Sequence, residues 1–320
     1  MTPRARGTII LRARDFRAHA AQGAIIAKRR GIFAREAFIK EDSNMRHGIY
    51  RGLAMTVAGS DSGGGAGIQA DLKTFASLKV FGTSAITAVT VQNSVGVTGI
   101  HPVPPEIIKA QILAVGRDFP LDAVKTGMLG NRGAISAVAE GLSELGVKKL
   151  VVDPVMVAQS GDSLLEADAV DAVKSIIVPM AMIVTPNLPE AEKLTGMTVR
   201  TVEEMKAAAE EIAKLGCGAV LVKGGHLGGE PDVITDVLYA DGKMTLFEDK
   251  RIDTTANHGT GCTLSSAIAA ELAAGCGLEE AVTRARLYLR AGLHYGVTAG
   301  HGAGCLGHAV TMPWTEIING

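Results

Sequence analysis

The sequence has few aromatic residues, no long apolar run and no pair of cysteines at metal-binding spacing. Phe, Trp and Tyr make up 4% of the 320 residues, and every apolar stretch of about 18 residues is interrupted by Gly, Pro or charge. This argues against a membrane span. The four cysteines (Cys217, Cys262, Cys276 and Cys305) form no C-x-x-C pair. We therefore expect neither a disulfide scaffold nor a zinc site, and a reducing cytoplasm as the location.

Charge is scarce overall but unevenly distributed. The formal net charge is −1, yet residues 1–51 carry ten Arg and two Lys against four acidic residues, a net charge of +8. The rest of the chain therefore carries about −9. It has no basic excess of the kind that nucleic-acid-binding domains show, so we expect no nucleic-acid partner.

The Arg-rich start of the chain differs from the rest of the sequence. Residues 1–52 have no strand–helix rhythm and no apolar core of the length that a signal peptide needs, and they are poor in Ser, unlike a transit peptide. We predict a poorly ordered extension or an early start codon, with Met45 and Met55 as alternative starts. The predicted organisation is an extension over 1–52, one catalytic domain over 53–310 and a tail over 311–320.

Hydrophobic residues make up 47% of the chain, and their pattern alternates between strand and helix periods from residue 53. The predicted strands span 53–58, 83–91, 95–103, 123–126, 149–153, 182–185, 219–222, 233–239 and 243–248. The predicted helices span 68–78, 105–115, 132–145, 167–177, 189–194, 202–215, 261–274 and 278–298. This order predicts an α/β fold with a mainly parallel sheet flanked by helices on both faces. Asp241-Gly242 predicts a hairpin at an antiparallel edge.

The most informative motif is Asn257-His258-Gly259-Thr260-Gly261-Cys262, directly before a helix. Gly259 and Gly261 allow a tight turn, and the helix N-terminus offers N–H groups and a positive dipole end to an anion such as a phosphate. Cys262 lies in that turn, where a lowered thiol pKa would let it accept a proton from an attacking hydroxyl. The alternative is that Cys262 only positions the hydroxyl.

Other polar motifs also come directly after predicted strands. Gly59 to Gly67 is a Gly-rich loop without a Walker A ending, and it is followed on a helix by Asp71. Gln92 ends the next strand, and its amide offers both a donor and an acceptor to a heterocyclic ring. Asp153 ends a later strand, where a carboxylate could hold Mg²⁺ beside a triphosphate, and Lys223 ends another, where it could neutralise phosphate. Each motif alone is weak evidence, but in a parallel sheet all of them lie at the carboxyl ends of the strands, on the same side of the sheet.

Asn187 and Glu190 come after the strand over 182–185, in a turn stiffened by Pro186 and Pro189. An amide and a carboxylate together suit a water-coordinated Mg²⁺ ion. The same two residues also fit a helix cap with a capping box, and the two roles can coexist.

These motifs resemble those of hydroxymethylpyrimidine/phosphomethylpyrimidine kinases. The most specific are Gly67-Ile68-Gln69-Ala70-Asp71 and His258-Gly259-Thr260-Gly261-Cys262, and the resemblance spans about residues 53–295. Further matching segments are 58–66, 72–75, 91–93, 125–129, 153–156, 185–191 and 223–226. The extension before residue 53 has no counterpart in the pattern of this family.

The resemblance implies a ribokinase-like fold and a role in thiamine biosynthesis. Such enzymes use ATP and Mg²⁺ to phosphorylate 4-amino-5-hydroxymethyl-2-methylpyrimidine and then its monophosphate, and the architecture is often a homodimer. The implied roles cover ring recognition by Gln92, a pocket lined by Gly59, Asp71 and Met128, an anion hole at Gly259, Thr260 and Gly261, and catalysis by Cys262. They also include nucleotide-phosphate contacts by Lys223 and Asp153, and Mg²⁺ coordination by Asn187 and Glu190.

Three alternatives remain open from the sequence. A pyridoxal kinase of the same fold would also bind a ring with a hydroxymethyl group. A ribokinase-like sugar kinase would carry Asp at the position of Cys262. A non-catalytic pyrimidine-binding regulator would have no need of Lys223, Asn187 and Glu190 together.

Overall fold

The computed structural model describes residues 48–156, 169–225 and 232–316. The strands are β1 Leu53–Ser60, β2 Phe81–Gln92, β3 Val97–Pro102, β4 Ala123–Thr126, β5 Leu150–Val152, β6 Ile183–Val184, β7 Ala219–Val222, β8 Val233–Ala240 and β9 Lys243–Lys250. The helices are α2 Gly67–Ser77, α3 Pro105–Asp118, α4 Arg132–Glu144, α5 Ala169–Ala172, α6 Leu188–Thr195, α7 Val202–Ala213, α8 Thr260–Ala273 and α9 Leu278–His294. A π turn (Val173–Ile177) and short 3-10 helices (Val178–Met180 and Pro313–Thr315) complete the described elements.

The strands form one nine-stranded sheet in the order β3-β2-β1-β4-β5-β6-β7-β8-β9. Strands β2, β1, β4, β5, β6 and β7 run parallel, as predicted. The chain turns outward from β1 to β2 and then returns to the other side of β1 with β4. Ligands bind beyond the carboxyl ends of strands at such a reversal.

Both edges of the sheet are antiparallel, whereas the sequence predicted one. The expected hairpin β8–β9 turns at Asp241 and Gly242, which have φ angles of 50° and 74°, so that prediction is confirmed. At the other edge, β3 pairs antiparallel with β2. The segment 95–103 was expected to be extended, but its partner was not predicted, because pairing direction is not encoded in the local pattern.

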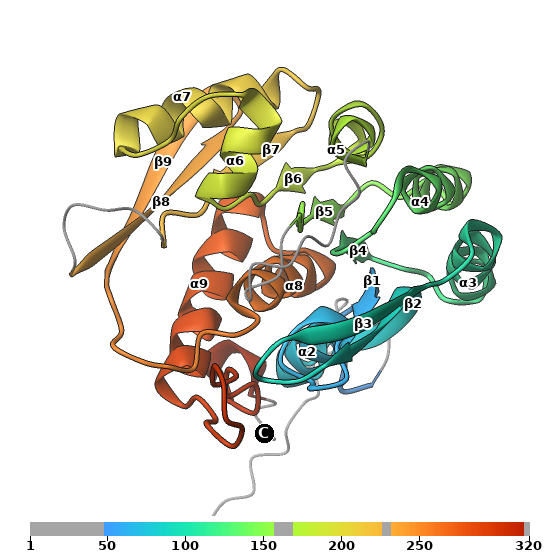
Figure 1. The fold of residues 1–320 in the computed structure, drawn as a ribbon, viewed down its shortest axis with the longest axis horizontal. Coiled ribbons are helices and arrows are strands. Elements are labelled where there is room, and N and C mark those ends of the chain that lie inside the picture. The colour runs from blue at the N-terminus through green and yellow to red at the C-terminus, as the bar shows by residue number, and fades with distance from the viewer. Residues whose placement is uncertain (1–47, 157–168, 226–231, 317–320) are drawn as a thin grey trace, which may run out of the picture. The chain divides into compact units, whose positions relative to one another are not determined.

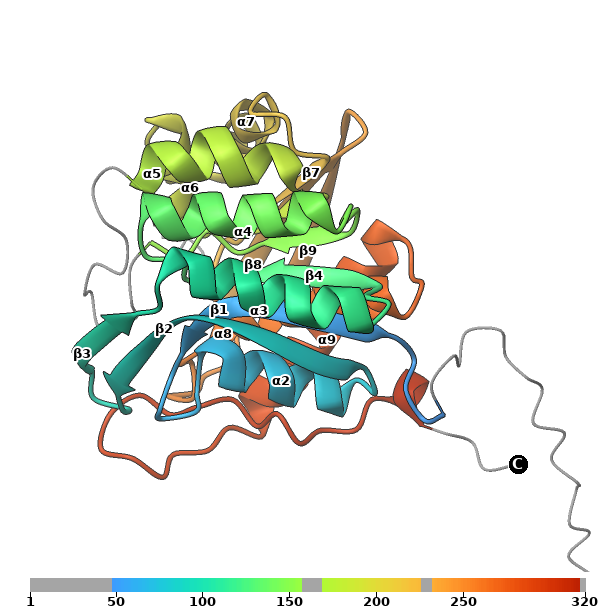
Figure 2. The ribbon, with the colours of Figure 1, turned by 90° about the vertical axis from the view of Figure 1, so that its right-hand side faces the viewer.

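Helices cover both faces of the sheet (Figures 1 and 2). One face packs against α3, α4, α6 and α7 through residues such as Ile112, Leu142 and Ile212. The other face packs against α2, α8 and α9 through residues such as Phe75 and Ile268. The second face matters for function, because α8 contacts β1, β4 and β5 at the centre of the sheet.

The two ends of the described chain are attached to the last turn of α8. Arg51 donates two hydrogen bonds to the buried carboxylate of Glu271, at 2.8 and 3.0 Å, and Trp314 Nε1 donates to the same carboxylate at 2.9 Å. Tyr50 packs edge-on against Phe81. The packed domain therefore includes residues on both sides of the predicted 53–310 range. The rest of the Arg-rich extension lies outside the described residues.

In the part of the chain that the structure describes, no helix has the length and apolarity needed to cross a membrane.

Candidate active site

The turn before α8 has the geometry of an anion-binding loop. Gly259 is the N-cap of α8, with φ +83°, and a methyl group added there would overlap the carbonyl oxygen of Gly65. Glycine is therefore required both by the left-handed backbone and by the close approach. Thr263 N donates to Gly259 O at 2.9 Å, so the N–H groups of residues 260–262 come before the first helical hydrogen bond. Such N–H groups are available to an anion.

The Gly-rich loop after β1 is organised by Asp61. Its carboxylate accepts hydrogen bonds from the N–H groups of Gly63, Gly65 and Ala66, at 2.8 to 3.0 Å. Burial by itself would raise the pKa of Asp61, but the hydrogen bonds from His258 and from these amides hold it below its ordinary value. No role for Asp61 was predicted from the sequence.

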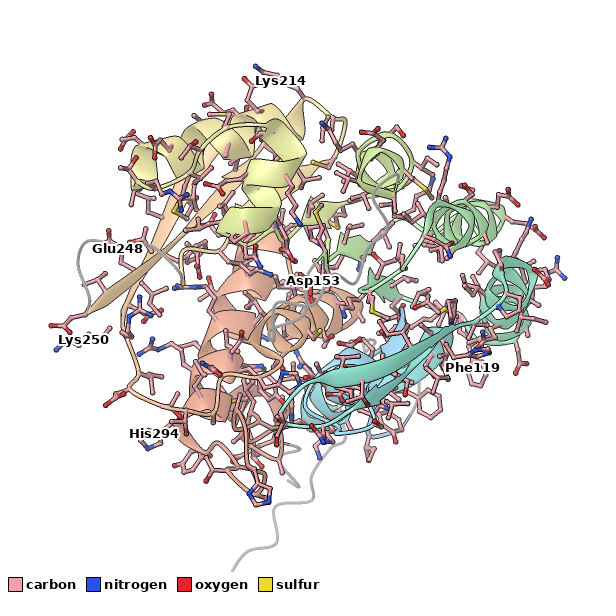
Figure 3. The ribbon with its side chains drawn as sticks, in the orientation of Figure 1. Phe119, Asp153, Lys214, Glu248, Lys250 and His294 are labelled. Atoms are coloured by element: carbon pink, nitrogen blue, oxygen red, sulfur yellow. The ribbon has the colours of Figure 1, made fainter. Side chains whose placement is uncertain are left out.

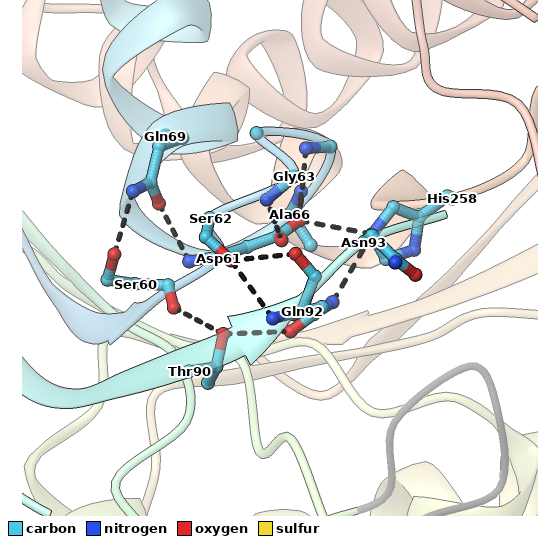
Figure 4. A network of polar contacts seen from close by, with 12 residues as sticks. Ser60, Asp61, Ser62, Gly63, Ala66, Gln69, Thr90, Gln92, Asn93 and His258 are labelled. Carbon is cyan, nitrogen blue, oxygen red and sulfur yellow. Dashed lines mark hydrogen bonds and ion pairs between the residues drawn. The ribbon is translucent and has the colours of Figure 1, made fainter. Parts of the chain in front are cut away.

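His258 joins the two loops, as Figure 4 shows. Its Nε2 atom lies 3.1 Å from Asp61 Oδ2 and 3.5 Å from Nε2 of Gln92. Gln92 is held from the other side by Thr90, whose hydroxyl also donates to Ser60 O. The amide expected to recognise a ring therefore lies next to the residue that precedes the anion-binding loop.

Gly59 and Met128 are in direct contact at the end of β1. A methyl group at Gly59 would lie 2.5 Å from Met128 Cε, too close for two carbon atoms. Thr87 Oγ1 donates to Met128 O at 2.6 Å, which fixes the segment after β4 against β2. The structure thus places these two predicted pocket residues in contact, Gly59 near the end of β1 and Met128 just after β4.

Asp71, the third predicted pocket residue, is fully buried. Its carboxylate accepts hydrogen bonds from Thr56 on β1, Ser266 on α8 and Lys125 on β4, and the Lys125 Nζ–Asp71 Oδ2 distance is 2.9 Å. Lys125 is also fully buried. Burial by itself would lower the pKa of Lys125, but Asp71, with smaller effects of Cys262 and Asp153, raises it above its ordinary value.

No role for Lys125 was predicted from the sequence, although a signal was present. Lys125 is the one ionisable residue in β4, whose four residues are all buried. A lysine in a buried strand requires a partner, because an isolated buried charge is too costly. That requirement predicts a carboxylate nearby, but which carboxylate depends on the packing of α2 against β1 and α8.

The prediction that the helix N-terminus lowers the thiol pKa of Cys262 is wrong. Burial raises the pKa of Cys262 to about 11, and Asp71 and Asp153 add to this effect. Lys125 and an amide of Gly67 oppose it. The prediction considered the helix dipole and the loop amides, and it omitted burial and two carboxylates from distant parts of the sequence.

Lys223 and Asp153 meet beside the anion-binding loop. Lys223 Nζ lies 3.1 Å from Asp153 Oδ1, and an added methyl group at Gly261 would lie 3.2 Å from Lys223 Nζ and 3.6 Å from Asp153 Oδ2. Ser265 on α8 donates to Asp153 Oδ2 at 3.3 Å. Figure 3 shows Asp153 near the centre of the molecule, next to α8. His226, the last residue of the matching segment 223–226, lies outside the described residues.

Asn187 and Glu190 form the capping box that was one of their two predicted roles. Glu190 N donates to Asn187 Oδ1 at 2.9 Å, and Asn187 N donates to Glu190 Oε2 at 2.8 Å. Burial raises the pKa of Glu190 to about 7. Lys223 opposes this shift, and the carboxylate of Asp153 adds to it.

This acidic region fits a magnesium ion bound through waters and phosphates. The described residues contain no group of three or more His, Cys, Asp or Glu side chains arranged as a complete metal site. Mg²⁺ usually binds to only one or two carboxylates and takes its remaining ligands from water and substrate phosphates. The buried carboxyl groups of Glu190 and Asp153 both lie beside Lys223, and a divalent cation would favour the charged form of both.

A segment near the end of the described chain completes the site, and it was not predicted from the sequence. His258 pairs in a β-bridge with Cys305, and His258 N donates to Gly304 O at 3.0 Å. Ala303 N donates to Ser94 O at 3.1 Å, in the turn after β2. The sequence predicted a helix to residue 298 here. Instead α9 ends at His294, because Val297 pairs with Cys305.

The sequence of this chain is similar to that of known kinases. The family model described as phosphomethylpyrimidine kinase matches residues 61–307. A hydroxymethylpyrimidine/phosphomethylpyrimidine kinase of Bacillus subtilis is 48% identical over 257 residues, which cover 79% of this chain and 93% of the relative.

Two solved structures match with high similarity. A phosphomethylpyrimidine kinase from Clostridium difficile has 44% identity and a TM-score of 0.67, over 74% of this chain and 97% of its own. An ADP complex of a pyridoxal kinase from Bacillus subtilis has 37% identity and a TM-score of 0.75, over 81% and 97% of the two chains. On the match of its sequence, its fold and its site, the chain belongs to the phosphomethylpyrimidine kinase family.

Proposed function

We propose that the protein transfers the terminal phosphoryl group of ATP to 4-amino-5-hydroxymethyl-2-methylpyrimidine, and then phosphorylates the monophosphate to the diphosphate, in thiamine biosynthesis. The observation that carries this proposal is the contact between the two loops. Asp61, His258 and Gln92 join the Gly-rich loop, the ring-binding strand end and the anion-binding turn within a few ångströms. A hydroxymethyl group on a bound ring would therefore lie next to a bound phosphate.

The substrate end of the site consists of Gln92, Gly59 and Met128. Gln92 would recognise the aminopyrimidine edge, because an amide offers a donor and an acceptor side by side. The missing side chain of Gly59 leaves room for Met128, whose thioether would pack on the ring. Asp71 supports this pocket from beneath through its hydrogen bonds to Thr56 and Lys125.

The phosphate end consists of Gly259, Thr260 and Gly261 with Lys223 and Asp153. Backbone N–H groups at the start of α8 would stabilise the charge that develops on the transferred phosphoryl group. Lys223 would neutralise phosphate charge once Asp153 is engaged elsewhere. Asn187 and Glu190 would hold Mg²⁺ through waters, and the ion would supply charge neutralisation for the nucleotide phosphates.

In the reaction, the hydroxymethyl oxygen bonds to the γ-phosphorus as the bond from that phosphorus to the bridging oxygen breaks, and ADP leaves. Because such transition states are loose, the hydroxyl proton leaves late and alignment contributes most of the rate. The Cys262 sulfur would accept that proton in its thiolate form. In its thiol form, it would orient the hydroxyl group.

Phosphorylation of pyridoxal is the second candidate activity. It is supported by the match to the Bacillus subtilis pyridoxal kinase structure, which covers 81% of this chain with 37% identity and a TM-score of 0.75. A homodimeric assembly and a cytoplasmic location stay predictions.

An ATP-consumption assay with a panel of acceptors tests the proposal. The panel contains hydroxymethylpyrimidine, its monophosphate, pyridoxal and ribose, each with Mg²⁺ and at equal concentration. We expect the highest kcat/KM with hydroxymethylpyrimidine and measurable turnover of the monophosphate. Higher kcat/KM with pyridoxal would assign the second activity, and binding of the pyrimidine without any ATP consumption would indicate a regulator.

A further inference from the structure

A buried ion pair lies beneath the anion-binding helix. Asp71 and Lys125 are both fully inaccessible to solvent, and Lys125 Nζ lies 2.9 and 3.0 Å from the two carboxylate oxygens. Thr56 and Ser266 donate to the same carboxylate. Buried pairs add little to stability compared with apolar residues of the same volume. The chemistry of the neighbouring site is therefore a better explanation for this pair.

The helix α8 brings Cys262 to this ion pair. Cys262 and Ser266 are four residues apart, so their side chains lie on the same face of α8, one turn from each other. Ser266 Oγ is hydrogen-bonded to Asp71, which places the Cys262 sulfur one turn closer to the helix N-terminus than the Asp71 carboxylate. The side chain of Lys125 extends to this same carboxylate from β4, a strand that α8 contacts.

Four charged groups lie along the first two turns of α8, where Ser266 donates to Asp71 and Ser265 donates to Asp153. Two are cationic, Lys125 from β4 and Lys223 from the segment after β7, and two are anionic, Asp71 from α2 and Asp153 from the segment after β5. Of the two cations, Lys223 is paired with Asp153 in the proposed phosphate region. Lys125 has its partner away from that region, and therefore remains in place while nucleotide binds.

We propose that Lys125 is a positioning residue for phosphoryl transfer, whose ammonium group, held by Asp71, is the cationic partner of the Cys262 sulfur when that sulfur carries negative charge. This inference rests on the proposed function and deepens it. It also assigns a role to the buried Asp71 carboxylate, which holds the Lys125 ammonium group near the start of α8.

The test is the rate at which iodoacetamide alkylates Cys262 as a function of pH, because only the thiolate reacts. Mass spectrometry of the Cys262 peptide separates this thiol from the other three cysteines. Lys125→Met removes the positive charge, so we expect alkylation at pH 7.5 to fall about tenfold, one pKa unit. Lys125→Gln also removes the charge but can still donate a hydrogen bond to Asp71, and the rate should fall by a similar factor.

The matched control removes the same charge at the opposite end of the sheet. Lys149→Met removes an ammonium group that donates to Leu272 O, near the end of α8. This change should not move the alkylation rate of Cys262 by more than about twofold, because charges that far apart are strongly screened.

Thermal unfolding decides whether each variant is folded before its thiol is assayed. If Lys125→Met does not fold, Lys125→Gln still tests the proposal, because glutamine can donate a hydrogen bond to Asp71. A folded Lys125→Gln or Lys125→Met protein with unchanged or faster alkylation would overturn the inference. We also expect Lys125→Met to lower kcat while the KM for ATP stays within about twofold, since the pair binds no nucleotide in this scheme. The alkylation assay needs no substrate, so its outcome is independent of whether the proposed acceptor is correct.

Discussion

Cys262 lies at the start of α8, next to the predicted positions of both substrates. Replacing Cys262 with Ala should reduce kcat by more than tenfold if the sulfur accepts or orients the hydroxyl proton, because general-base catalysis typically contributes about a hundredfold or more. Steady-state kinetics with hydroxymethylpyrimidine measures this. Cys276→Ala, at the other end of the same helix region, is the control. A Cys262→Ala rate within about threefold of the unmodified protein would exclude both roles.

Gly259 tests the anion-binding turn through the backbone. Gly259→Ala combines a φ of +83° with an overlap against Gly65 O, so it should cost about 1–3 kcal/mol of stability and reduce kcat at least tenfold. Gly275 has a similar φ of +90° and open space around it. Gly275→Ala should therefore show the backbone strain alone, with unchanged kcat. Equal kinetic losses in both variants would contradict the assignment of residues 259–261 to phosphate binding.

For single residues, the sequence predicted which positions need a given residue type better than it predicted the electrostatic surroundings of a side chain. Gly259 was predicted correctly as a backbone requirement, because a Gly-rich turn before a helix is a local pattern. The pKa of Cys262 was predicted in the wrong direction, because it depends on Asp71 and Asp153, which reach the sulfur only after the sheet has formed. Lys125 was overlooked for the same reason.

Helices α6 and α7 both begin with a capping box, but only α6 begins at the proposed phosphate region. Asn187→Ala should cost about 1 kcal/mol through loss of the capping box, and so should Thr201→Ala at the start of α7. Only Asn187→Ala should also weaken Mg²⁺-dependent turnover, because Thr201 lies away from the proposed phosphate region. Comparison of Tm and of the Mg²⁺ concentration for half-maximal rate separates the two contributions. A shared stability loss without a difference in Mg²⁺ dependence would leave Asn187 as a cap alone.

Strands and helices were largely predictable because their signals are short-range. The strands over 123–126 and 219–222 agree with the prediction, and the hairpin turn was predictable from Asp241-Gly242. The end of α9 was not predictable, because Val297 leaves the helix to pair with Cys305, a contact without a periodic pattern. The pairing of His258 with Cys305 brings a distant segment into the site in the same way.

For the whole molecule, a buried histidine links stability to pH. His308 Nε2 lies 2.9 Å from Thr263 Oγ1 in the first turn of α8. Burial lowers the pKa of His308 to about 4, from an ordinary value near 6.5, and Lys73 adds to the effect. The unfolded chain therefore binds a proton between these values while the folded protein does not. The contribution of neutral His308 to the free energy of unfolding should be fully present above pH 6.5. It should fall by up to about 3 kcal/mol as the pH approaches 4.

Denaturant unfolding at several pH values measures this loss. His308→Gln keeps a hydrogen-bonding group opposite Thr263 and removes the titration, so its stability should change less between pH 6.5 and 4. His294→Gln, at an exposed position, should behave like the unmodified protein. A His308→Gln curve parallel to that of the unmodified protein would show that other groups cause the acid sensitivity.

The attachment of Arg51 and Trp314 to Glu271 has a practical consequence for the architecture. Because both segments are fixed at the last turn of α8, the described chain leaves the domain at the end of the sheet where β1 begins, opposite the loops that would bind substrate (Figure 2). A purification tag, a fluorescent protein or an immobilising tether joined through either segment would emerge on the side remote from the chemistry. Substrate entry should then be unaffected by what is attached there.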